Sequence, residues 1–99
     1  MDITLALPES SKPSSIRKVI TALRAQKLDI VHDHKNWGDW IRLAGCETVI
    51  SIECNDGLTS SATVEHNDDD SEDILPAIYR AFHQLGWIGI DEDGEFQLL

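Results

Sequence analysis

The sequence contains little cysteine, no long apolar segment and almost no basic residue in its second half. Only two of the 99 residues are cysteine, Cys46 and Cys54. No apolar run approaches the ~18 residues that a transmembrane helix needs, and residues 1–4 lack the basic start of a signal peptide. Because free thiols are typical of a reducing compartment, we expect a cytoplasmic protein with no membrane partner.

Motifs for catalysis and for cofactor binding are also missing. The chain has no glycine-rich phosphate loop, nucleophile elbow, C-x-x-C or H-E-x-x-H spacing. The acidic run before Gly94 does not fit a calcium loop, because its last ligand position would fall beyond Leu99. We therefore expect a non-enzymatic protein without a cofactor.

Length and composition predict one globular domain over residues 1–99. Hydrophobic residues make up 41% of the chain, which is typical of a folded domain. A chain of this length buries roughly two-thirds of its unfolded surface, enough for one two-layer core.

The first half begins with a predicted strand and a predicted helix. Alternation of Ile3, Leu5 and Leu7 indicates a strand that ends at Pro8. A helix to about Lys27 follows, with an apolar stripe at helical spacing: Ile16, Val19, Ile20 and Leu23. Serines around Pro13 offer N-caps for it: Ser10, Ser11, Ser14 and Ser15.

A second helix is predicted after residue 73. Its apolar positions follow the helical repeat: Ile74, Ile78, Ala81, Phe82 and Leu85. Asp73 is the preferred N-cap, because Pro76 then occupies a position where no amide hydrogen is needed. Gly86 is a natural left-handed terminator, and Trp87 is expected beside the core.

The central segment predicts a hairpin over residues 50–65. A three-residue loop at 55–57 gathers the apolar side chains on one face, pairing Cys54 with Leu58, Ile52 with Ser60 and Ile50 with Ala62. The opposite face is then polar: Ser51, Glu53, Thr59, Ser61, Thr63 and Glu65.

The C-terminus predicts a second hairpin, with residues 92–94 as its loop. In this register Ile90 faces Phe96 and Ile88 faces Leu98. Two further strands are predicted at residues 29–34 and 40–43, with the intervening residues as a turn.

The order of elements favours an α+β two-layer sandwich, with a mainly antiparallel sheet and two helices on one face. A ferredoxin-like plan with an added hairpin is one option. From Ser14 onward, the helix–strands–helix–hairpin order also resembles small bacterial secretion-chaperone-like folds.

Charge is divided unevenly along the chain, whose net charge is −10. Residues 50–99 hold twelve acids and one base, Arg80, and Asp68, Asp69 and Asp70 are consecutive. Solvated loops explain part of this pattern. If the acids of the second half form one surface, that surface would attract a basic protein partner or the basic first helix of a second copy. Nucleic acid is not expected, because it requires a net basic surface.

Two residue groups are candidates for a site. His32 and His34 share one side of a predicted strand, as two imidazole ligands of a metal would. Trp40 and Arg42 are expected on the outer side of the next strand, with Trp37 nearby, as an aromatic anchor for a partner. The alternative for the two histidines is an ordinary polar strand end, and the alternative for Trp40 is that it covers its own sheet.

The sequence thus predicts an acidic protein–protein interaction module, such as an inhibitor, chaperone or adaptor. The alternative is a small metal- or ligand-binding protein, or a minor enzyme, centred on His32 and His34.

The excess of negative charge predicts a dependence of stability on salt. Like charges repel in the compact state, and salt screens that repulsion. We expect ~0.5 M NaCl to raise the Tm in a thermal melt followed by circular dichroism. An unchanged or lower Tm would show that the acids are already paired.

Overall fold

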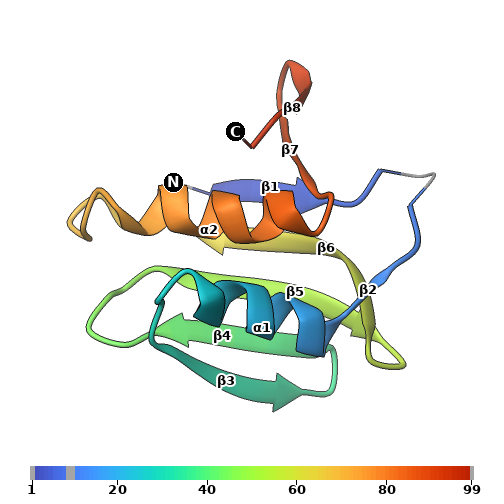
Figure 1. Cartoon of the computed structure of the whole chain (residues 1–99), viewed down its shortest axis with the longest axis horizontal. Helices are drawn as coiled ribbons and strands as arrows, with labels where there is room; N and C mark the ends of the chain where they lie inside the picture. The colour runs from blue at the N-terminus through green and yellow to red at the C-terminus, as the bar shows by residue number, and fades with distance from the viewer. Residues whose placement is uncertain (1, 9–10, 99) are drawn as a thin grey trace.

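The computed structural model describes residues 2–8 and 11–98, which form an α+β fold measuring 35 × 31 × 22 Å (Figure 1). In chain order its elements are β1 (Asp2–Ala6), β2 (Ser14–Ser15), α1 (Ile16–Ala25), β3 (Ile30–Lys35), β4 (Gly38–Leu43), β5 (Val49–Asn55), β6 (Leu58–Glu65), α2 (Ile74–Gln84), β7 (Ile88–Asp91) and β8 (Gly94–Phe96). The predicted fold class is confirmed: two helices and an antiparallel sheet. Within the described ranges, neither helix is long and apolar enough to cross a bilayer.

The sheet has the strand order β3-β4-β5-β6-β1-β7-β8, and every pairing between the described strands is antiparallel. The short β2 also pairs with β6, through Ser14–Thr59 and Ser15–Leu58, just beyond the end of β1. The chain therefore leaves β6 after β1 and returns to it immediately before α1.

Both helices lie on the same side of the sheet, α1 in front of β4 and β5 and α2 in front of β1 and β6 (Figure 1). Their buried side chains, including Val19, Leu23, Ile78 and Phe82, pack on the buried strand residues in one core. Trp87 is 2% exposed and contacts Phe82 with ring centroids 4.9 Å apart. The prediction that this tryptophan lies at the core is confirmed.

The helix boundaries follow the predicted caps closely. Ser15 is the N-cap of α1, and its hydroxyl accepts a hydrogen bond from the Lys18 amide at 3.2 Å. The helix ends at Ala25, earlier than predicted, because Lys27 adopts a left-handed conformation (φ 64°). Asp73 precedes α2 and Gly86 (φ 83°) follows it, as predicted. Ser10 lies outside the described residues.

The register predicted for the central hairpin is wrong. The turn has two residues, Asp56 and Gly57, both with positive φ, as a type I′ hairpin requires. Ile50 pairs with Val64 and Ile52 with Ala62, and a register shift lies between Glu53 and Asn55. This bulge adds one residue on β6. With uninterrupted pairing, a two-residue turn would place apolar side chains of β5 opposite polar ones of β6; the extra residue keeps the apolar side chains of both strands on one face.

The bulge also reverses the faces of the first residues of β6. Thr59, predicted to face solvent, is 2% exposed, and its hydroxyl donates a hydrogen bond to the Glu53 carbonyl at 2.7 Å. Leu58, predicted to be inside, is 46% exposed. The buried threonine is tolerated because its polar atom has a partner.

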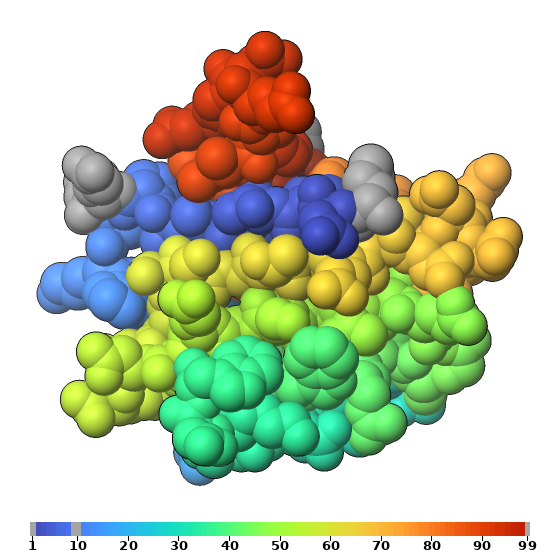
Figure 2. Space-filling model, turned by 180° about the vertical axis from the view of Figure 1, so that it is seen from behind, coloured from blue at the N-terminus to red at the C-terminus, as the bar shows by residue number. Residues whose placement is uncertain are grey.

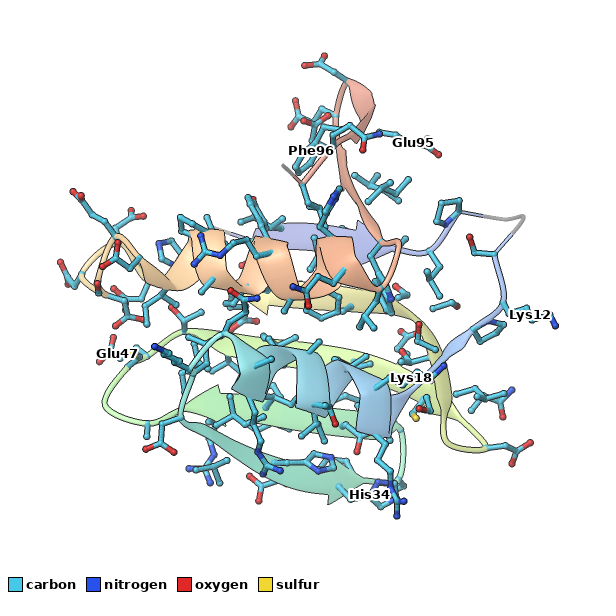
Figure 3. The ribbon with its side chains drawn as sticks, in the orientation of Figure 1. Lys12, Lys18, His34, Glu47, Glu95 and Phe96 are labelled. Carbon is cyan, nitrogen blue, oxygen red and sulfur yellow. The ribbon has the colours of Figure 1, made fainter. Side chains whose placement is uncertain are left out.

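The C-terminal hairpin also differs from the prediction, by one residue. Gly89 pairs with Phe96 and Asp91 with Gly94, so the loop is Glu92–Asp93. A Cβ on Gly89 would lie 2.1 Å from the Phe96 ring, so this glycine provides the space that the ring fills. Glu95 and Phe96 extend to opposite sides of the hairpin (Figure 3).

Two glycines predict a contrast in stability. A Cβ on Gly38 would lie 2.0 Å from the backbone oxygen of Ile52, whereas a Cβ on Gly45 (φ 75°) meets nothing within 4 Å. We expect Gly45→Ala to lower the free energy of unfolding by only about 1–2 kcal/mol, the cost of a left-handed alanine. Gly38→Ala should cost clearly more in urea denaturation, because β4 and β5 must separate. Equal losses would contradict the close approach of these strands.

Candidate functional site

A buried carboxylate lies between β3 and β4 at the edge of the sheet. His34 and Asp39 are register partners, and His32 is two residues away on the same side of β3. Asp39 alternates with the buried Ile41 along β4, so its side chain faces the core side, and the residue is 0% exposed. The fold thus brings an acid from β4 and two histidines from β3 together on the face that the helices cover.

Both histidines contact the same oxygen of Asp39. His32 Nε2 lies 2.5 Å and His34 Nδ1 3.2 Å from Oδ1. Burial raises the pKa of Asp39, but hydrogen bonds with His32, His34 and Cys54 outweigh this effect and hold the pKa below its usual value. Asp39 is therefore ionised at neutral pH, and each imidazole donates an N–H to it. Its second oxygen, Oδ2, is buried without a hydrogen-bond partner in the described part of the chain.

Neither thiol of the protein is prepared for nucleophilic attack. Burial, followed by the neighbouring Asp39, raises the pKa of Cys54, and burial, followed by Asp70, raises that of Cys46. A reactive cysteine needs the opposite shift. Both cysteines are free, and the thiol of Cys54 is part of the polar surroundings of Asp39.

The metal-binding prediction for His32 and His34 is not tested by this geometry. The two side chains share one side of β3, as predicted, and Asp33 points away and pairs with Arg42 at 3.2 Å. Among residues 2–8 and 11–98, no three His, Cys, Asp or Glu side chains form a group suited to a metal ion. The 2.5 Å contact between His32 and Asp39 leaves no space for an ion between them, since zinc lies about 2.0–2.2 Å from each such ligand.

Asp39 is the residue that the sequence prediction missed, because it was assigned to the turn between two strands. A signal was present in the alternation of Asp39 with Ile41 and Leu43. Extending that strand by two residues places the carboxylate on the inner face, beside the two histidines of the neighbouring strand.

A groove of about 460 Å³ runs between α1 and His32 on β3. Its lining includes Arg17, Thr21 and Arg24 from α1, His32 from β3 and Gly57 from the central turn. Both arginines are exposed, and neither forms an ion pair with another described residue. This groove is therefore basic, in contrast to most of the molecule.

The predicted aromatic surface lies on the other face of the sheet. Trp37 and Trp40 meet edge-to-face, with ring centroids 6.4 Å apart, and Trp37 is 48% exposed. Arg42 is not available as a free cation because it is paired with Asp33. A hollow of about 460 Å³ beside Trp37 is also lined by Glu53 and Leu58.

The acids at 68–70 are separated from the tryptophans. Asp70 accepts hydrogen bonds from the amides of Glu47 (3.1 Å) and Thr48 (2.7 Å) and from the Thr48 hydroxyl, and the hydroxyl contributes most to its lowered pKa. Asp70 thus holds two loops together, whereas Asp68 and Asp69 are exposed. These loops flank the Arg42–Val49 end of β4 and β5, opposite the end that carries Trp37.

A larger hollow, about 770 Å³, lies where β1 and β7 separate. Pairing of these strands stops at Thr4 and Ile90, and beyond that point the C-terminal hairpin diverges from the sheet (Figure 1). We call this hollow the acidic cleft; it is lined by Asp2, Ile3, Thr4, Tyr79, Ile90, Asp91, Glu92, Asp93 and Phe96. Four of these residues are carboxylic acids and none is basic.

Comparisons with known proteins add no family to this description: no family model matches the chain, and neither a curated protein nor a solved structure matches it.

The Asp39 cluster predicts a non-additive effect of substitution on stability. His32→Leu removes the nearer partner of the buried Asp39 carboxylate, so we expect the free energy of unfolding to fall by about 1–3 kcal/mol in urea. In the double variant His32→Leu/Asp39→Leu the loss should be smaller, because no uncompensated charge remains.

The exposed pair between Asp33 and Arg42 provides the control. Asp33→Asn should change the free energy of unfolding by less than about 1 kcal/mol. If the two leucine substitutions are simply additive, Asp39 does not depend on His32.

Proposed function

We propose that the protein is a non-enzymatic interaction module that binds a basic segment of a partner protein in the acidic cleft. One observation carries the proposal: Asp2, Asp91, Glu92 and Asp93 surround a hollow that contains no basic residue. Carboxylates held around one hollow reinforce each other's potential and favour a cation there.

The apolar part of the cleft favours a Lys or Arg side chain over a small metal ion. Tyr79 and Phe96 contact each other edge-to-face at 6.4 Å and line the cleft together with Ile90. Aromatic faces attract ammonium and guanidinium groups, and the aliphatic stems of Lys and Arg cover apolar surface while their charge stays near carboxylates. A basic protein segment satisfies both parts of the lining.

The uncovered face of the sheet extends the surface that such a partner can contact. Seen from behind, this face is formed by the strands and has no helix across it (Figure 2). It carries Trp40 and Arg42 on β4, and Trp37 lies in the adjoining turn beside Glu53 and Leu58. Binding there would serve the inhibitor, chaperone or adaptor roles that the sequence suggests.

The cytoplasmic location belongs to the same proposal and is supported by the two free cysteines. A ferredoxin-like or secretion-chaperone-like topology stays a prediction within the α+β class.

The proposal predicts that a basic peptide binds at the cleft. The probe is a fluorescein-labelled decapeptide of alternating Lys and Ala with one central Arg, and binding is followed by fluorescence anisotropy. Asp91→Asn/Glu92→Gln/Asp93→Asn should weaken binding by at least about tenfold, or about 1.4 kcal/mol. Higher salt should weaken binding to the unmodified protein, because the attraction is electrostatic.

The control removes the same number of charges elsewhere. Asp68→Asn/Asp69→Asn/Glu72→Gln has the same net charge as the cleft variant but leaves the cleft intact. We expect it to change the Kd by less than about threefold. An equal loss of peptide affinity in both variants would show that binding responds to net charge alone, and would contradict the cleft as the binding site.

A further inference from the structure

The groove between α1 and β3 concentrates positive charge in a protein with a net charge of −10. Arg17, Thr21 and Arg24 follow one another at spacings of four and three residues, so they form one stripe along α1. Two helical turns separate the arginines, about 10 Å along the axis, and their long side chains can therefore reach a common point near Thr21.

His32 adds a fixed ring to the opposite wall of this groove. Its Nε2 is bound to Asp39 Oδ1 at 2.5 Å, and Asp39 is fully buried. A buried carboxylate hydrogen-bonded to an imidazole fixes the orientation of the ring. The other ring nitrogen, Nδ1, has no hydrogen-bond partner within the described ranges.

We propose that this groove binds a small dianionic oxyanion, a phosphate group or the phosphoryl end of a small metabolite. The guanidinium groups of Arg17 and Arg24, which form no ion pair with another described residue, supply planar forks of donors that match phosphate oxygens. The Thr21 hydroxyl supplies a further donor from α1, and the His32 ring forms the opposite wall. The volume of about 460 Å³ lies within the range of ordinary small-ligand sites.

The buried partner of His32 distinguishes this groove from an ordinary basic helix face. A helix that only needs solubility requires no carboxylate at 0% exposure hydrogen-bonded to a histidine of the neighbouring strand. Such a carboxylate costs desolvation energy. The cost is explained if the charge holds His32 in place for an anion.

The test is a titration of the 15N-labelled protein with inorganic phosphate at pH 7 and constant ionic strength, followed by NMR. We expect saturable shifts of the amide signals of Thr21, His32 and Gly57. Arg17→Gln/Arg24→Gln should weaken phosphate binding by at least about tenfold, since each charged hydrogen bond contributes about 1.5–3 kcal/mol. The phosphoryl source is then distinguished by titrating glycerol phosphate and phosphoserine in the same way.

The matched control is Lys12→Gln/Lys18→Gln, which removes the same charge near the start of α1. Lys12 and Lys18 lie on the other side of α1 from His34 (Figure 3), and neither lines the groove. This variant should bind phosphate within about threefold of the unmodified protein, with a circular dichroism melt to confirm that both variants are folded.

Three outcomes would overturn the proposal. Shifts that stay linear with phosphate concentration would indicate general ionic effects. An equal loss in the lysine control would indicate a response to net charge. Shifts of the groove signals on diluting the protein without phosphate would identify the acidic surface of a second copy as the occupant instead. The first two outcomes do not bear on the acidic cleft, and in the third the cleft variant tests whether the cleft is the surface that occupies the groove.

Discussion

The apolar stripes of α1 and α2 pack on one face of a single sheet, and this one-sided burial determines where every polar group can lie. Side chains alternate along each strand, so each residue is assigned either to the core or to the uncovered face. Ile41 and Leu43 are buried on β4, for example, while Arg42 between them is exposed. The same alternation that builds the core therefore places Trp40 outside and Asp39 inside, one residue apart.

The parts of the fold that depend on local patterns were predictable. The limits of α2 follow from Pro76 and Gly86, and the strand β1 follows from the alternation of Ile3 and Leu5. Hairpin registers were not: a bulge changes the pairing of the central hairpin without changing its apolar pattern, and the C-terminal hairpin pairs Gly89 with Phe96, whose ring fills the space above the glycine. At the central turn, the predicted register made Thr59 an outer residue, whereas the bulge turns it inward and its hydroxyl is satisfied by the Glu53 carbonyl.

The candidate site shows the same division between local and long-range information. The shared side of His32 and His34 is a local property of one strand, and the sequence predicts it. Their contact with Asp39 depends on the pairing of β3 with β4, and the groove depends on where α1 crosses the sheet. Likewise, the acidic cleft combines residues from β1, α2 and the C-terminal hairpin, which no local pattern brings together. The acidic run at 68–70 is prominent in the sequence, but one of its residues, Asp70, joins two loops through hydrogen bonds.

The Asp39 cluster also lies on an edge strand, which offers a second physical reason for its existence. β3 has a neighbour on one side only, and inward-pointing charged residues are one way in which proteins prevent edge strands from pairing with other chains. Edge protection requires only a charge near the strand end. It gives no reason for Arg17 and Arg24 to line a groove opposite His32 in a strongly acidic protein. The two roles are compatible, since a charge that protects the edge can also orient a ring toward a ligand, and the proposed anion site is the role that also uses the arginine stripe.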